Sequence, residues 1–192
     1  MSSSFFAMLS RMKHIDRWGL MRNTWKESLS EHSFDVAAIA HGLAVLGNTR
    51  FGKQYNCERV ALLGLFHDTS EIITGDLPTP VKYHDDEIKQ AYKKVEDIAS
   101  RSLLQMIPDD LSDSYSDLLL PNEADLPLWR LVKAADKISA YIKCVEEESA
   151  GNREFVKAKQ TLLQAIEALD SEEANAFLDE FMPSFEKTLD EQ

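Results

Sequence analysis

Three ionisable side chains interrupt an apolar segment of the sequence, and their types are those that bind metal ions. The segment LLGLFHDTSEII, residues 62–73, carries His67 and Asp68 side by side and Glu71 shortly after them. Burying such groups is costly unless they are paired or bound to a metal. On a helix, His67 and Asp68 would flank one groove, and Glu71 would follow one turn later. The segment could therefore give an ion two ligands, although an HD dipeptide can also be merely structural or solvated.

Two further residues, on separate segments, could complete a ligand set. His32 lies in SLSEHSFDVAAIAHGLAVL, at the start of an expected helix, and Asp136 lies in WRLVKAADKISAYIKC. Small residues around Asp136 leave room for a bound group. The alternatives are a capped, partly exposed helix start for His32 and a surface acid paired with a neighbouring lysine for Asp136.

Two imidazoles and two carboxylates would form a mixed nitrogen and oxygen site. Such a site suits Mn, Co, Fe, Zn or Ni better than Mg, which prefers oxygen ligands alone. This ligand set would leave positions open for water and a substrate oxygen. Water bound to such an ion has a lowered pKa and can act as a nucleophile at neutral pH. The residue types therefore favour one divalent metal ion that supports hydrolysis.

The composition limits the partners. The chain has 192 residues, 44% of them hydrophobic, and a formal net charge of −12. A surface this acidic repels phosphate polymers, so we expect no nucleic-acid polymer as a partner. No apolar run approaches the ~20 residues of a membrane span, and no signal peptide is evident. Two cysteines far apart suggest reduced thiols. We expect a soluble, cytoplasmic protein without a membrane partner.

Helical periodicity dominates the chain, and alternating strand patterns are nearly absent. We therefore predict an all-α fold of about seven to nine helices, in a single domain that covers residues 1–192. The loops DRWGLMRNTWKESL and TGDLPTP separate the expected helices near the ionisable residues. The expected helices cover roughly residues 3–14, 30–48, 57–73, 85–107, 126–150, 153–169 and 171–189, with a shorter one from 109. Pro183 should kink or interrupt the last of them.

The ionisable residues also follow a known order. His32, His67, Asp68 and Asp136 form the pattern H…HD…D, with each part on its own expected helix. This pattern resembles the metal-binding signature of the HD-domain superfamily of phosphohydrolases. The resemblance implies an HD-domain helical bundle that binds a divalent ion.

A closer resemblance covers nearly the whole chain and is strongest from Phe5 to Tyr83. The segments FFAMLSRMKHIDRWGLMRNTWKESLSEHSFDVAAIAHGL, LLGLFHDTSEIITGDLPTPVKY and AADKISAYIKCVEEESAGN resemble the YfbR-like 5′-deoxynucleotidases. This likeness implies hydrolysis of deoxyribonucleoside 5′-monophosphates to deoxyribonucleosides and phosphate. It also implies a homodimer, for which apolar faces near Phe177, Phe181 and Phe185 could supply an interface or could equally be core.

The same resemblance implies roles for further residues. Glu71 corresponds to the catalytic acid of the family, close to the metal and the phosphate. Asp76, in GDLPTP, matches the acid on the 3′-hydroxyl side of the sugar. Arg17 and Trp18, in DRWGL, match the residues that hold the phosphate and sense the sugar. Lys82 is a further candidate for a phosphate or loop contact.

Other interpretations stay open at the level of the sequence. Trp18 could be plain core, and Arg17 could form an ion pair with Asp16 or Glu27. The chain could be another HD-superfamily phosphohydrolase or phosphodiesterase, although signalling-nucleotide hydrolases generally need further motifs. It could also be a non-catalytic, nucleotide-binding helical domain, but an intact Glu71 argues against lost activity. Neither the native metal, Co or Mn among others, nor the preferred base follows from the sequence.

Overall fold

Helices account for the regular structure of this computed structural model, which describes residues 3–82, 84–120 and 122–192. Tyr83, the last residue of the segment that most resembles the family, lies outside the described residues. Within the described ranges there is no β-strand, and an isolated antiparallel bridge joins Asp16 and Ser28. The predicted all-α fold class is therefore confirmed.

Packing divides the chain into two compact units. The first comprises Met1–Met21, Lys26–Ser33 and Phe66–Asp125, and the second comprises Arg22–Trp25, Phe34–Leu65 and Leu126–Gln192. The expected single domain over residues 1–192 stays a prediction.

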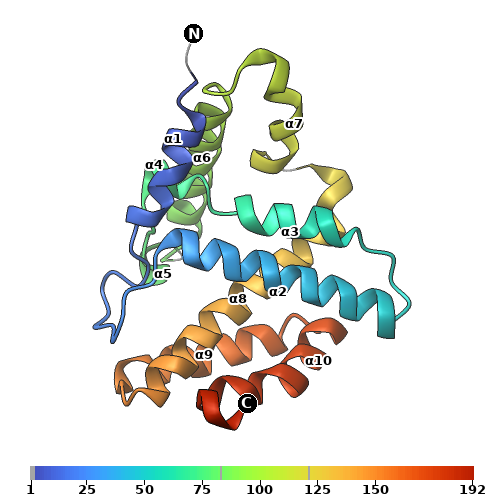
Figure 1. The fold of residues 1–192 in the computed structure, drawn as a ribbon. Coiled ribbons are helices and arrows are strands. Elements are labelled where there is room, and N and C mark those ends of the chain that lie inside the picture. The colour runs from blue at the N-terminus through green and yellow to red at the C-terminus, as the bar shows by residue number, and fades with distance from the viewer. Residues whose placement is uncertain (1–2, 83, 121) are drawn as a thin grey trace. The chain divides into compact units, whose positions relative to one another are not determined.

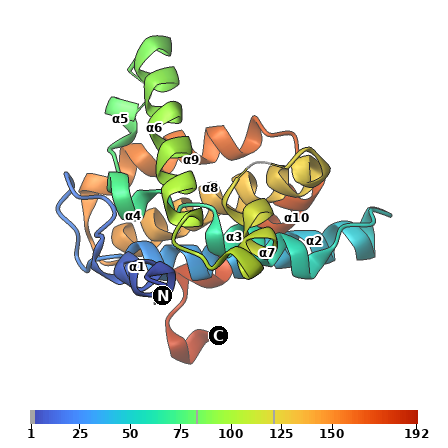
Figure 2. The ribbon, with the colours of Figure 1, turned by 90° about the horizontal axis from the view of Figure 1, so that it is seen from above.

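The first unit contains short helices packed around one long helix. Figure 1 shows α1 beside α6, and Figure 2 shows α4 and α5 beside α6. The ring of Tyr115 contacts Phe5 and Phe66, with centroid distances of 5.2 and 6.1 Å, and these aromatic rings stabilise the unit by burial. The elements of this unit are α1 (Phe5–Leu9), η1 (Ser10–His14), α4 (Glu71–Thr74), α5 (Thr79–Lys82), α6 (Asp86–Leu104), α7 (Asp109–Leu119) and η2 (Glu123–Asp125).

The helix expected over residues 57–73 is interrupted, so that prediction is wrong. Helix α3 (Cys57–Phe66) ends at Phe66, and a turn over residues 67–70 precedes α4. The Thr69 hydroxyl and backbone N–H both donate to the Phe66 carbonyl, over 2.9 and 3.2 Å. A side chain that bonds to the local backbone in this way competes with helix continuation. His67 and Asp68 therefore lie on a turn, and the expected loop TGDLPTP contains the start of the single-turn helix α5.

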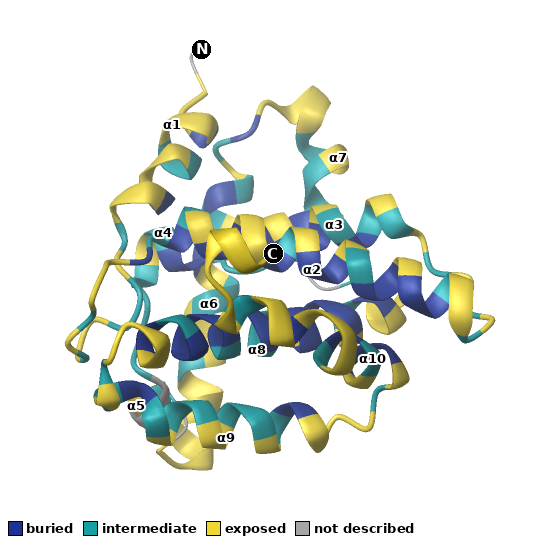
Figure 3. Ribbon diagram, turned by 60° about the horizontal axis from the view of Figure 1, so that its bottom comes forward, coloured by how far each residue is buried: buried dark blue, intermediate teal, exposed yellow. Residues whose placement is uncertain are grey.

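In the second unit, helix α2 (Leu29–Arg50), which begins in the first unit, contacts α3 closely. A Cβ atom on Gly64 would lie 2.9 Å from the Ala37 Cα atom, so the approach requires glycine. Helix α8 (Leu126–Ser149) packs on α9 (Val156–Glu167) and α10 (Glu172–Phe181), and Figure 3 shows α8 buried along much of its length. The remaining elements are η3 (Arg153–Phe155), η4 (Met182–Glu186) and η5 (Leu189–Glu191). Helix α10 ends at Phe181 and η4 begins at Met182, directly before Pro183, so the interruption predicted there is confirmed.

A buried ion pair on α8 fixes a distant segment of the same unit. Glu147 accepts hydrogen bonds from the Thr24 backbone N–H, at 2.9 Å, and from the Asn152 amide, at 2.8 Å. Lys143 pairs with Glu147 and donates to the Trp25 carbonyl over 2.8 Å. Burial alone would raise the pKa of Glu147, but hydrogen bonds from Lys143, Thr24 and Asn152 lower it to about 2. The ionised carboxylate thus holds residues 22–25 against α8.

As far as the chain is described, none of its helices is both long enough and apolar enough to cross a membrane.

Candidate active site

The predicted loop DRWGLMRNTWKESL is closed at its base by backbone hydrogen bonds. The Arg17 N–H donates to the Glu27 carbonyl, and the Leu29 N–H donates to the Ile15 carbonyl, each over 2.9 Å. These bonds pair residues that lie ten or more positions apart in the chain. They bring the start of the loop, with Arg17 and Trp18, next to its end, with Glu27.

A capping box begins helix α2 directly after this loop and places His32 in the first turns of the helix. The Ser28 N–H donates to the Glu31 carboxylate over 2.7 Å, and the Glu31 N–H donates to the Ser28 hydroxyl over 3.3 Å. This reciprocal pair satisfies backbone groups that a helix start otherwise leaves without partners. His32 is completely buried, with 0% of its surface exposed. The alternative interpretation of His32, as a residue in a partly exposed helix start, is therefore wrong.

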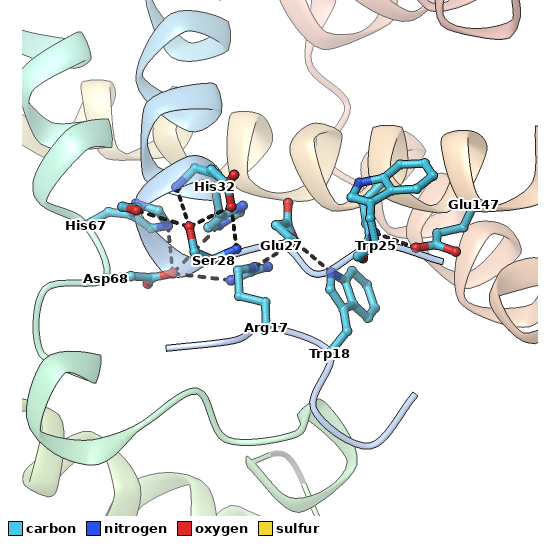
Figure 4. A network of polar contacts seen from close by, with 12 residues as sticks. Arg17, Trp18, Trp25, Glu27, Ser28, His32, His67, Asp68 and Glu147 are labelled. Atoms are coloured by element: carbon cyan, nitrogen blue, oxygen red, sulfur yellow. Dashed lines mark hydrogen bonds and ion pairs between the residues drawn. The ribbon is translucent and has the colours of Figure 1, made fainter. Parts of the chain in front are cut away.

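Three of the four expected metal ligands meet in the first unit. His67 Nε2 lies 3.0 Å from Asp68 Oδ2, and His32 Nε2 lies 3.7 Å from the same oxygen (Figure 4). One donor atom from each residue falls within 4.8 Å of the others, a spacing at which the three could hold a metal ion. Two imidazoles and one carboxylate are donors that divalent transition metals accept.

The surrounding charges keep Asp68 in the form that a metal requires. Burial alone would raise the pKa of Asp68, but His67, His32 and Arg17 hold it well below its usual range. Asp68 is therefore ionised at neutral pH. A carboxylate must be deprotonated to bind a metal ion.

Asp136, the fourth expected ligand, lies in α8 within the second unit and is half-buried. Its role as a metal ligand stays a prediction.

Glu71 begins helix α4 and is buried, with 4% of its surface exposed. Burial raises the pKa of Glu71 to about 9, and the negative charges of Asp68 and Asp76 add to this effect, whereas Lys82 and Arg17 oppose it. Its Oε2 atom is buried and has no hydrogen-bond partner within the described part of the chain. Glu71 therefore holds a proton at neutral pH near the ionised Asp68, as a general acid must.

Arg17 and Trp18 are held by one carboxylate. Glu27 Oε2 accepts a hydrogen bond from Trp18 Nε1 over 2.8 Å and from Arg17 Nε over 3.2 Å. Arg17 Nη1 lies 3.7 Å from Asp68 Oδ2, so the guanidinium also faces the expected ligands. The ion pair between Arg17 and Glu27 was one alternative from the sequence, whereas Asp16 pairs with Lys26. Trp18 is half-buried and therefore not plain core.

Asp76 and Lys82 lie in the same unit, on either side of the start of α5. Burial raises the pKa of Asp76, while Arg17 and a hydrogen bond from the Trp18 backbone oppose the rise. Lys82 Nζ lies 2.7 Å from Glu96 Oε1 on α6 and 4.0 Å from Glu71 Oε1. Asp76 is thus linked to the loop that carries Trp18, and Lys82 lies among carboxylates.

Comparisons with known proteins agree over almost the full length of the chain. Residues 4–185 match the family described as "5′-deoxynucleotidase YfbR-like". A 5′-deoxynucleotidase of Vibrio cholerae serotype O1 is 53% identical, over 98% of this chain and 97% of the relative. The 5′-deoxynucleotidase YfbR of Salmonella typhi is 51% identical, over 98% of this chain and 95% of the relative.

Solved structures show the same fold. An HD-domain phosphohydrolase from Listeria innocua matches with a TM-score of 0.81 and 25% identity, over 95% of this chain and 88% of the other. The HD phosphohydrolase DatZ of cyanophage S-2L, solved with dA and one catalytic Zn²⁺ ion, matches with a TM-score of 0.66 and 20% identity, over 95% and 96% of the two chains. At that lower identity the second likeness concerns the fold alone.

Proposed function

This chain belongs to the YfbR-like 5′-deoxynucleotidase family, and we infer that it hydrolyses deoxyribonucleoside 5′-monophosphates to deoxyribonucleosides and phosphate. It is an enzyme, a phosphoric monoester hydrolase with an HD-domain fold. One structural observation favours hydrolysis over a non-catalytic role. The ionised Asp68, between two histidines, and the protonated Glu71 lie in the same unit, so a metal-binding group and a proton donor occur together.

We propose that His32, His67 and Asp68 bind one divalent ion and that Asp136 is its fourth ligand. The donor types fit the transition metals, which include Co, Mn and the Zn²⁺ of the cyanophage phosphohydrolase. When bound, such an ion supplies an acidified water and draws charge from a phosphoryl oxygen. Support for Asp136 comes from the order of the signature in the sequence.

The residues around this site would then share the work of hydrolysis. Arg17 carries a planar guanidinium whose Nη1 faces Asp68, and such a group suits the binding of phosphate oxygens. Attack of water on phosphorus breaks the bond between phosphorus and the 5′ oxygen. We propose that Glu71 gives its proton to the departing 5′ oxygen, so that the deoxyribonucleoside leaves as an alcohol. Glu71 regains a proton from the attacking water.

Lys82 is proposed to assist this step through its charge. Its Nζ lies 4.0 Å from Glu71 Oε1, and an ion pair with Glu96 Oε1, at 2.7 Å, holds the ammonium group there. A cation at this place would stabilise Glu71 after it has lost its proton, and it would add positive charge for a phosphate.

Sugar selectivity is assigned to Trp18 and Asp76. An indole against the deoxyribose would leave no space for a 2′-hydroxyl, and a carboxylate at Asp76 could accept a hydrogen bond from the 3′-hydroxyl. The hydrogen bond between the Trp18 backbone and Asp76 supports the proposal, because it links the two residues. The preferred base has no such structural support.

We expect the wild-type enzyme to prefer dAMP over AMP and Trp18→Ala to narrow this preference. Burying the extra hydroxyl without a partner costs roughly 1–3 kcal/mol, which corresponds to about tenfold to a hundredfold in specificity. The measurement is kcat/KM for both substrates in the wild type, in Trp18→Ala and in Trp18→Phe, which keeps an aromatic wall.

The outcomes separate two claims. Equal treatment of dAMP and AMP by the wild type would contradict the deoxynucleotidase assignment and favour a general nucleotidase. If the wild type and Trp18→Ala prefer dAMP over AMP equally well, the deoxynucleotidase activity is supported and only the proposed role of Trp18 is contradicted.

A homodimer and a cytoplasmic location are further proposals, which rest on the family resemblance and on the composition. Phe177 is buried, but Phe181 is 40% exposed and its ring centroid lies 5.0 Å from that of Phe177. Phe181 could therefore contribute to an interface. The molar mass in solution, measured by light scattering, tests the homodimer, which a monomeric mass would contradict.

A further inference from the structure

We propose that Glu27 is a positioning residue, which holds Arg17 and Trp18 in the geometry that phosphate binding and sugar selection require. This inference rests on the proposed function. The carboxylate of Glu27 binds Arg17 and Trp18, and Glu27 acts through these two neighbours.

The side-chain hydrogen bonds of Glu27 converge on a single carboxylate oxygen. Its Oε2 atom accepts a hydrogen bond from Trp18 Nε1 at 2.8 Å and from Arg17 Nε at 3.2 Å (Figure 4). The Glu27 carbonyl also accepts the Arg17 backbone N–H at 2.9 Å. One residue therefore fixes the backbone and guanidinium of Arg17 and the indole of Trp18.

The bond to Nε has a directional consequence, because a guanidinium is planar and rigid. When Arg17 Nε donates to Glu27, the Nη1 side of the guanidinium must point away from Glu27. Nη1 lies 3.7 Å from Asp68 Oδ2, on the side of the expected metal ligands. Glu27 thus determines which part of Arg17 faces the place where a phosphate would bind.

The burial of Glu27 supports a specific role for its charge. Only 8% of the residue is exposed, and a buried carboxylate is costly unless charge and hydrogen bonds compensate it. The guanidinium supplies the charge, and the indole N–H supplies a second hydrogen bond. A residue needed only to close the loop could do so with its backbone, which already pairs with Arg17 and requires no buried charge.

The backbone of Trp18 provides an independent observation. Its φ angle is +58°, in the left-handed region that bulky side chains rarely adopt. Such a conformation persists only when surrounding contacts impose it, and it occurs frequently at functional sites. The contacts that act on this residue include the indole bond to Glu27, the backbone bond to Asp76 and the bond from the Met21 N–H to the Trp18 carbonyl, at 2.9 Å. Glu27 is the contact that orients the ring.

The test compares Glu27→Ala, Glu27→Gln and the control Asp16→Asn. Glutamine keeps an acceptor oxygen but loses the charge, whereas alanine loses both. Asp16 lies next to Arg17 in the chain, and its exposed carboxylate pairs with Lys26. The control therefore removes the same charge from the same loop without touching the Arg17 or Trp18 side chain. For each variant we would measure kcat and KM with dAMP and AMP, the metal content and the melting temperature.

We expect Glu27→Ala to lower kcat/KM for dAMP by about tenfold or more, mainly through KM, and to reduce the ratio of dAMP to AMP activity. Glu27→Gln should raise KM for dAMP to an intermediate value and retain more of the ratio. Asp16→Asn should match the wild type, and metal content should stay at the wild-type value throughout.

A Glu27→Ala variant that loses dAMP and AMP activity in equal proportion would overturn the proposal, since that is the signature of a merely structural role. An Asp16→Asn variant as impaired as Glu27→Ala would also overturn it. If Glu27→Ala does not fold, Glu27→Gln decides, and a wild-type KM in that variant would contradict the role of the charge. If the wild type does not distinguish dAMP from AMP, the proposed function is wrong. This result comes from the wild type alone and is therefore separate from the test of Glu27.

Discussion

Replacing Glu71 with alanine is expected to abolish most turnover while metal and substrate still bind. Groups that transfer protons in the transition state typically contribute on the order of 10²–10⁴ in rate. Burial and the carboxylates of Asp68 and Asp76 raise the pKa of Glu71 to about 9, so the side chain carries the proton that a departing 5′ oxygen needs. We therefore expect kcat for dAMP to fall by about 10²–10⁴ and KM to change little.

The matched variant is Glu71→Gln, which preserves shape and hydrogen bonding but cannot transfer a proton. It should lose nearly as much kcat as Glu71→Ala, whereas the exposed Glu58→Gln on α3 should behave as the wild type. Because the acid form of Glu71 is lost as pH rises through its folded pKa, the wild-type kcat should decline on the alkaline side. If kcat for dAMP falls by less than about fivefold in both variants, the loss is too small for a proton donor, and Glu71 is structural.

Replacing Asp68 with alanine is expected to remove both the bound metal and the activity. Asp68 Oδ2 lies close to both imidazoles, at 3.0 Å from His67 Nε2 and 3.7 Å from His32 Nε2. It is also the anionic member of the three residues. Changes in outer-shell partners alone cost about 10–100-fold in metal affinity, and loss of a direct ligand should cost more. Metal content of the purified protein, determined by elemental analysis, measures the effect.

The control for this experiment is Asp35→Ala, an exposed acid on the helix that carries His32. It should retain wild-type metal content. Asp136→Ala belongs in the same series, because a loss of metal there would support the fourth ligand and full retention would reduce the site to three residues. Equal metal content in the wild type and Asp68→Ala would exclude the proposed ligand set.

The sequence predicts the helices well where periodicity and caps coincide. Asp85 caps α6 through a 2.8 Å bond from the Ile88 N–H, and Ser171 caps α10, close to the expected boundaries. The interruption after Phe66 could not be predicted, since the pattern of apolar residues continues through the turn. What ends the helix there is a side-chain bond from Thr69, and periodicity carries no information about such bonds.

The candidate site, like the helices, could be predicted from the sequence only in part. Neighbouring groups such as His67 and Asp68 could be identified from residue type and order. The pairing of Glu27 with Arg17 could be named only as one of two alternatives, and the bond from Trp18 to the same carboxylate was not predicted, because both depend on how the loop closes on itself. The Lys82 contact with Glu96 joins residues on separate helices, and no local pattern indicates it. Long-range packing of this kind decides which charges meet.

The most direct test of a metal-dependent 5′-deoxynucleotidase is a titration of the metal-free protein with Mn²⁺, Co²⁺ or Zn²⁺ while phosphate release from dAMP is measured. We predict no release without an ion, a rise in rate that saturates at one ion per chain, and much slower release from AMP under the same conditions. Full activity in the metal-free protein, or no release from dAMP with any of the three ions, would contradict the proposed function.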